Sequence, residues 1–189
     1  MSAPAPEWAI CAALNSNDRD RQAIRAEFEG AQATFHALLE SASEEELARP
    51  SNGTRWTNRQ LLFHMLFGYM VVRNLLPLVK IINRLPDSGR VFAALLDAAT
   101  RPFDIINYWG SRAGSRVYST QRMGRKFDAV IAALERRLAA EPEANMERST
   151  AFPTRWDPFF KSKMTLADVY HYPTQHFDFH QRQLTLSGS

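Results

Sequence analysis

Large apolar side chains recur at intervals of three and four residues along much of this sequence, and this periodicity restricts the fold more than any other feature. Such intervals return a side chain to the same face of an α-helix. The two clearest series are Ile24, Phe28, Ala31, Phe35, Leu38 and Leu39, and Met123, Phe127, Val130, Ile131, Leu134 and Leu138. Because hardly any segment alternates apolar and polar residues, we predict an all-α fold, a four-helix bundle.

Capping residues indicate where the first two long helices lie. The first helix is predicted over 18–42. Thr57 and Gln60 form a capping-box pair, so the second helix is expected to begin at residue 58 and to reach about residue 82. Because proline has no amide proton for a helical hydrogen bond, Pro77 is expected to bend or break this helix.

The other two long helices are predicted in the C-terminal half of the chain. The third covers 119–140. The last begins at Thr165, which forms a capping-box-like pair with Asp168, and runs to about residue 186. Pro173 lies inside it and is expected to bend it.

Two connections between these helices are longer than usual. Residues 83–116 are interpreted as an insertion with its own helix over 91–98, which Arg101 and Pro102 interrupt. Residues 141–163 are interpreted as a second long loop. Both are candidates for a lid or a docking surface.

The length of 189 residues predicts one domain over 1–189, with an N-terminal extension over 1–17. The single cysteine, Cys11, cannot close an internal disulfide, so a reducing, cytoplasmic location is the simplest interpretation. A cysteine-rich zinc motif is excluded, so metal ligands must come from histidine and carboxylate side chains. Thiol chemistry would accordingly use an external thiol.

No segment is predicted to cross a membrane. The apolar run 8–14 has seven residues and no basic region before it, unlike a secretory signal. The run 61–72 has twelve residues without formal charge, whereas a spanning helix needs about 20. We therefore predict a soluble protein with no membrane partner.

The net charge of +3 conceals a basic middle region. Residues 1–50 carry a net charge of −5 and residues 51–130 a net charge of +8. A solvated arginine-rich surface is favoured over nucleic-acid binding, because no recognised nucleic-acid motif frames the basic residues. Five basic residues follow one another without an intervening acid and could capture an anionic substrate group: Arg112, Arg116, Arg122, Arg125 and Lys126.

Two of the five histidines, His176 and His180, lie four residues apart in the last predicted helix. Four residues turn a helix by about 400°, so the two rings project within about 40° of each other, one turn apart. Both imidazoles can therefore reach one metal ion. They share their face with Val169, Tyr172 and Phe179, which indicates that this face points into the bundle, where an unpaired imidazole costs free energy.

His64 is the expected third member of the site. It lies in the apolar run 61–68, and Gly68, one turn later on the same face, leaves room for an ion or a substrate. Taken alone, His64 would be interpreted as a core histidine bonded to a neighbour, but three inward histidines in one bundle favour a metal site. His36 and His171 project away from these faces and are expected at the surface or its boundary.

Two segments resemble the histidine motifs of the DinB-like (damage-inducible) four-helix metalloproteins. The run from Thr54 to Met65 is similar to the W-[ST]-x-x-E-x-x-x-H-[LM] opening of that family's second helix. The run from His176 to Leu184 is similar to the H-x-x-x-H-x-x-Q-[LI] pattern of its last helix. The order and spacing of the motifs agree along most of the chain.

The resemblance implies an up-down-down-up bundle with one divalent ion, often zinc or nickel, held by three histidines. Here these would be His64, His176 and His180. The family includes thiol-dependent transferases and isomerases that use bacillithiol, mycothiol or glutathione, which implies a small-molecule substrate, a low-molecular-weight thiol and a homodimer. The sequence departs from the family at Gln60, where many members have glutamate, and in the length of the insertion over 83–116.

Three neutral imidazoles would leave the ion at least one open position, which is the catalytic pattern. An ion of this kind binds water or a thiolate. We therefore expect a metal-dependent enzyme, either a thiol-dependent S-transferase or isomerase or a hydrolase. A non-catalytic, stress-associated metal-binding bundle that acts through partners is the alternative.

Other side chains near the predicted site have candidate roles. Tyr172 lies one turn before His176 on the same face, and it is either a catalytic hydrogen-bond donor to substrate or a core tyrosine. Gln60 and Gln183 are candidates to orient the imidazoles. The last helix lacks the glutamate of an H-E-x-x-H motif, which argues against a metalloprotease.

Overall fold

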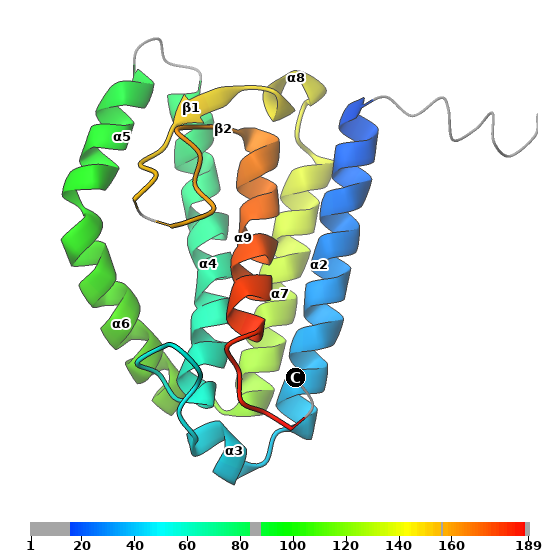
Figure 1. Cartoon of the computed structure of the whole chain (residues 1–189). Helices are drawn as coiled ribbons and strands as arrows, with labels where there is room; N and C mark the ends of the chain where they lie inside the picture. Colours follow the sequence, from blue (N-terminus) through cyan, green and yellow to red (C-terminus); the bar gives the residue numbers. More distant parts are fainter. Residues whose placement is uncertain (1–15, 84–87, 156, 188–189) are drawn as a thin grey trace, which may run out of the picture.

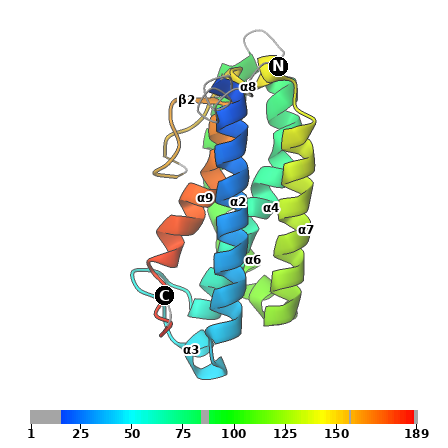
Figure 2. The same cartoon turned by 90° about the vertical axis from the view of Figure 1, so that its right-hand side faces the viewer.

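The computed structural model describes residues 16–83, 88–155 and 157–187, in which four long helices pack as a bundle (Figure 1). The four are α2 (Ser16–Ser41), α4 (Asn58–Ile82), α7 (Thr120–Ala139) and α9 (Leu166–Gln181). In Figure 1, α2 and α9 run in one direction and α4 and α7 run in the other. Helices α2 and α4 each contact both α7 and α9 (Figure 2). The predicted all-α, up-down-down-up bundle is confirmed.

The predicted apolar faces of α2 and α7 are buried in full and form the core together with α4 and α9. Five aromatic rings meet at the centre of the bundle: Phe28, Phe35, Tyr69, Phe127 and Phe177. The Phe127 ring centroid lies 4.5 Å from that of Phe35 and 4.9 Å from that of Tyr69. The Tyr69 hydroxyl hydrogen-bonds Thr174 at 2.8 Å. Each buried ring of this kind stabilises the fold by about 1.5–3 kcal/mol.

Side-chain caps set the helix boundaries that the sequence predicts. Thr57 accepts from the Gln60 amide and Gln60 accepts from the Thr57 amide, which starts α4 at residue 58. Thr165 and Asp168 make the same reciprocal pair at the start of α9. Pro77 lies inside α4 without ending it, so the expectation of a break is wrong. The buried side chains of α4 beyond this proline offset the lost hydrogen bond.

The connection between α4 and α7 consists of two helices, α5 (Ser88–Ala98) and α6 (Thr100–Val117), where one was predicted. Helix α4 ends at one end of the bundle and α7 begins at the other, so α5 and α6 run back along the outside of α4 (Figure 1). Pro102 does not interrupt this segment, because it lies in the first turn of α6, where the helix needs no amide donor.

Helix α6 turns its apolar side chains outward. Ile105 is 60% exposed and Ile106 and Trp109 are each 59% exposed, whereas Ser111 and Ser115 are buried against the bundle. A Cβ at Gly114 of α6 would overlap the Phe63 ring of α4. Small residues therefore let α6 approach α4 closely, and Ile105, Ile106 and Trp109 are left on the surface.

The long connection over 141–163 contains secondary structure that the sequence did not reveal. It begins with α8 (Glu143–Met146), and the strands β1 (Ser149–Ala151) and β2 (Lys163–Thr165) form an antiparallel hairpin. Between the strands, residues 152–155 and 157–162 form a segment that packs against α9, where the ring centroids of Phe160 and Tyr172 are 4.7 Å apart. This arrangement places the inter-strand segment beside the histidines of α9.

Helix α9 ends at Gln181, earlier than predicted, because the chain then turns back to pair with the loop before α4. The Asn52 amide donates to the Gln183 carbonyl oxygen at 2.7 Å, and Asn58 Nδ2 donates to Thr185 Oγ1 at 2.9 Å. This turn places Gln183 next to His180.

Helix α4 is the one described helix that is long and apolar enough to span a membrane. It lies within the bundle and contacts α6, α7 and α9, which accounts for its composition. Cys11 and most of the predicted N-terminal extension lie outside the described residues.

Candidate metal centre

The contact between α4 and α9 brings His64 together with His176 and His180. His64 lies in the second turn of α4, and the other two lie on consecutive turns of α9. They are 3%, 8% and 8% exposed, respectively. His64 Nε2 lies 3.1 Å from His176 Nε2 and 3.1 Å from His180 Nε2. The predicted triad is one cluster, the single group of this kind among the described residues.

Two of the histidines turn their other ring nitrogen to an acceptor. His176 Nδ1 donates to Asp157 Oδ2 at 3.0 Å, and His180 Nδ1 donates to Gln183 Oε1 at 2.7 Å. A neutral imidazole that donates through Nδ1 carries only a lone pair on Nε2. The Nε2 lone pairs of His176 and His180 therefore converge on His64 Nε2, and a proton on that atom can satisfy only one of them. A divalent cation is the partner that this buried donor set fits.

The surroundings keep the imidazoles of His64 and His180 neutral. Burial, and next the proximity of His176 and His180, lowers the pKa of His64 well below its usual range. Burial and the proximity of His176 lower the pKa of His180 to about 4. A histidine must be unprotonated to bind a metal, so at neutral pH no proton has to leave His64 or His180.

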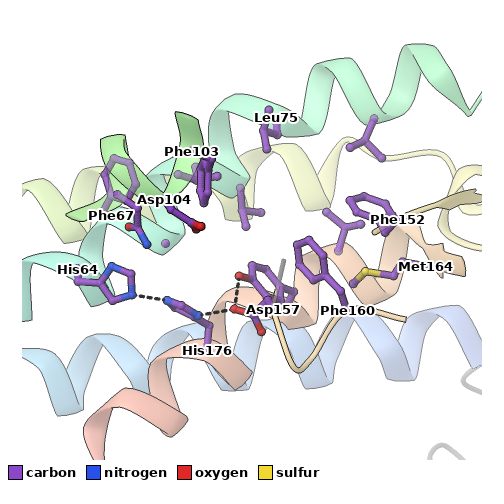
Figure 3. A pocket seen from close by; sticks show the side chains of 17 residues that line it. His64, Phe67, Leu75, Phe103, Asp104, Phe152, Asp157, Phe160, Met164 and His176 are labelled. Atoms are coloured by element: carbon purple, nitrogen blue, oxygen red, sulfur yellow. Dashed lines mark hydrogen bonds and ion pairs between the residues drawn. The ribbon is translucent and has the colours of Figure 1, made fainter. Parts of the chain in front are cut away.

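Asp157 is a member of the site that the sequence analysis did not find. Its Oδ2 accepts from His176 and also from the Tyr172 hydroxyl at 2.9 Å (Figure 3). Burial raises the pKa of Asp157, but hydrogen bonds from His176, the Phe159 amide and Tyr172 outweigh it and hold the pKa below its ordinary value. Asp157 is therefore an ionised acceptor that orients His176.

The hydrogen bond from Tyr172 to Asp157 determines the role of the tyrosine. Its ring lines the cavity beside the histidines, but its hydroxyl is engaged with the Asp157 carboxylate. Burial and this carboxylate raise the pKa of Tyr172 well above its ordinary value. The tyrosine is therefore a neutral hydrogen-bond donor to Asp157.

One general signal could have pointed to Asp157. Metal-binding histidines commonly donate their second nitrogen to a carboxylate, and the segment just before α9 contains one. The separation of 19 residues from His176 crosses a hairpin, however, so no helical spacing connects the two side chains. Only the fold of the inter-strand segment brings them together.

Trp56, Ser111 and Gly68 shape the pockets of the imidazoles. The Trp56 ring stacks on His64 with centroids 4.4 Å apart and an interplanar angle of 29°. Ser111 Oγ of α6 lies 3.5 Å from His64 Nδ1. A Cβ at Gly68 would lie 3.0 Å from His176 Cδ2, so the room predicted at Gly68 is taken up by the His176 ring.

The remaining candidate residues lie away from the cluster or have other partners. His36 pairs with Asp128 at 2.7 Å and His171 pairs with Glu27 at 2.9 Å, both partly exposed, as predicted. Gln183 orients His180 as predicted. The corresponding expectation for Gln60 is wrong, because its side chain caps α4.

The five basic residues between 112 and 126 do not border the cavity at the histidines. The Arg112 guanidinium packs against the Tyr108 and Trp109 rings, 5.5 Å from each centroid. Arg116, Arg122 and Arg125 are exposed. The interpretation of a solvated basic surface therefore accounts for these side chains, and the capture of an anionic substrate group at the histidines does not.

A cavity of about 90 Å³ extends from the histidines between α4, α6, α9 and the inter-strand segment (Figure 3). His64 and His176 lie at one end of it, and Phe152 and Met164 lie at the other. Its polar lining residues are His64, Asp104, Asn107, Asp157, Tyr172 and His176, and its other lining residues are Phe67, Gly68, Val71, Val72, Leu75, Val79, Phe103, Phe152, Phe160, Met164 and Val169.

Comparison with known proteins gives one match. The sequence profile of the DinB superfamily matches residues 27–184, a range that includes the three histidines, Asp157 and Gln183. No curated protein and no solved structure matches the chain significantly.

Proposed function

The chain belongs to the DinB superfamily, and we propose that it is a divalent-metal-dependent enzyme whose ion is held by His64, His176 and His180. The observation that carries this proposal is the convergence of the three buried Nε2 atoms. Asp157 and Gln183 support it, because each holds one ring by its Nδ1 with Nε2 directed at the centre.

Zinc and nickel are the ions we propose, because imidazole ligands suit both. When bound, such an ion would lower the pKa of a water molecule or a thiol at its open position. The chain itself orients the imidazoles and surrounds them with apolar walls. These walls exclude water from one side of the site.

The reaction class that we propose is a thiol-dependent S-transferase or isomerase acting on a small-molecule substrate in the cytoplasm. A low-molecular-weight thiol would be the second substrate, because the sequence has a single cysteine. A hydrolase is the second candidate. Asp157 is a poor general base for hydrolysis, since His176 and Tyr172 already occupy its Oδ2.

Metal analysis of purified protein tests the ligand set. The variants His64→Ala and His176→Ala should lose most of the bound metal. His36→Ala and His171→Ala are matched controls, because these histidines pair with carboxylates outside the cluster, and they should keep it. Equal metal content in all four variants would contradict the proposal.

A non-catalytic metal-binding bundle that acts through partners is the alternative function. Cobalt(II) substitution separates the two, since adding glutathione to an accessible catalytic ion changes its visible absorption. An absorption spectrum that does not change when glutathione is added, together with a large loss of thermal stability on chelation, would favour a structural ion.

A homodimer formed through α6 is the assembly that we propose, and we propose no nucleic-acid or membrane partner. The outward apolar face of α6 supports it, because two-fold dimers are the commonest way to cover such a surface. Sedimentation of the wild type and of Trp109→Glu tests it. A monomeric wild type would refute it.

A further inference from the structure

The cavity beside the histidines is long and narrow. The α4 residues that line it beyond His64 run from Phe67 to Val79, a separation of twelve residues or about 18 Å along a helix. Its volume is about 90 Å³, so its mean cross-section over this length is small. A small volume spread along such a length suits a single unbranched chain better than a ring.

The walls of the cavity are apolar beyond the histidine end. Val72, Leu75 and Val79 of α4 line one side, and Phe152 and Met164 line the far end (Figure 3). A charged or strongly hydrated group placed among these side chains would lose its water without gaining a partner. The portion of a ligand that lies there must therefore be hydrocarbon.

The charged groups of the cavity disfavour an anion. Its described lining includes the carboxylates of Asp104 and Asp157 and no lysine or arginine. The nearest arginine of the basic series on α6, Arg112, is held against Tyr108 and Trp109. Without an ion at the histidines, an anionic ligand would thus meet like charge and no basic side chain, whereas a divalent ion held there would attract it.

We propose that this cavity binds the unbranched aliphatic chain of a substrate, with its polar head group at the histidines and its tail directed toward Phe152 and Met164. This inference deepens the proposed function and rests on it only for the placement of the head group. The apolar walls hold the tail whether or not an ion is present.

Calorimetric titration with compounds of eight carbon atoms tests the shape and the charge of the ligand. In chelator-treated protein, which has no cation at the histidines, octanol should bind at least tenfold more tightly than octanoate, which adds a negative charge, and than 2-phenylethanol, which adds a ring. Along the series from butanol to octanol, the affinity should rise by about fourfold for each added methylene. Equal affinities for the three compounds, or no dependence on chain length, would overturn the proposal.

Two substitutions on α4 locate the binding. Leu75→Trp fills the cavity about 16 Å along the helix from His64, and it should abolish octanol binding without changing the metal content. Leu78→Trp is the matched control, because Leu78 is 43% exposed and outside the lining, and it should bind octanol normally. Octanol binding that survives Leu75→Trp would place the ligand elsewhere and refute the inference.

The chain-length titrations are repeated on metal-loaded protein, and metal uptake is measured separately, to separate this inference from the proposed function. Length-dependent binding without any metal uptake would leave the aliphatic site standing and remove the metal-dependent enzyme. Metal uptake by the three histidines without alkyl-chain binding would refute the aliphatic site and leave the proposed metal-dependent enzyme standing.

Discussion

Replacing Asp157 by asparagine tests how the candidate metal centre is organised. The substitution keeps the size of the side chain and an oxygen that can accept from His176 Nδ1, but it removes the negative charge. Asp157 and His176 are 11% and 10% exposed at their side chains, so solvent does little to replace the lost interaction. The variant should fold and bind the divalent ion more weakly.

The size of the effect follows from the hydrogen bond at 3.0 Å. A hydrogen bond to a charged group contributes about 1.5–3 kcal/mol and one between neutral groups about 0.5–1.5 kcal/mol. The difference of about 1–1.5 kcal/mol corresponds to roughly a tenfold loss of metal affinity. Asp157→Ala removes the acceptor altogether and should approach the hundredfold loss typical of such partners.

Competition between the protein and a chromophoric chelator for zinc measures these affinities. Asp104→Asn is the matched control, because Asp104 lines the same cavity and also loses a carboxylate, without a hydrogen bond to a histidine. Its affinity should stay within about twofold of the wild type, if direct contact with His176 is what matters. A folded Asp157→Asn protein with unchanged zinc affinity would refute the reasoning.

Two further predictions concern stability. Gly114→Ala should lower the free energy of unfolding by about 1–3 kcal/mol, because its Cβ would overlap the Phe63 ring. Gly110→Ala has no atom near its Cβ and should instead raise the free energy of unfolding by about 0.5–1 kcal/mol. Urea titrations measure both changes. The hydrogen bond from His171 to Glu27 raises the pKa of His171 above 6.5, so this pair stabilises the fold fully below about pH 6.5 and loses that contribution as pH rises through the raised value. Glu27→Gln should therefore cost about 0.5 kcal/mol near pH 6 and nothing near pH 9 in thermal melts, and a constant difference would contradict the assignment.

Features encoded within one helix could be predicted from the sequence. The apolar series from Ile24 to Leu39 identifies a buried face because helical geometry alone relates its members. The spacing of His176 and His180 is equally local, and His64 could be added because its helix is apolar all around. The capping pair of Thr57 and Gln60 set the start of that helix to the residue.

Features that depend on packing between distant segments could not be predicted. Helix α6 buries small polar residues such as Ser111 and exposes Trp109, so the periodicity of its apolar residues does not reveal which face is buried. The effect of Pro77 depends on the packing of the residues that follow it in α4. Asp157 reaches His176 only because the hairpin folds its connecting segment over α9.

The segment between β1 and β2 contributes to two sites at once. Its Asp157 holds His176, while its Phe152 and Phe160 form part of the cavity wall. A ligand that shifts this segment on binding must also change the affinity of the histidines for their ion, and thermodynamic reciprocity requires the ion to change the ligand's affinity by the same factor. Cooperativity between metal and substrate, of either sign, would then arise within one monomer and without any movement of the helices.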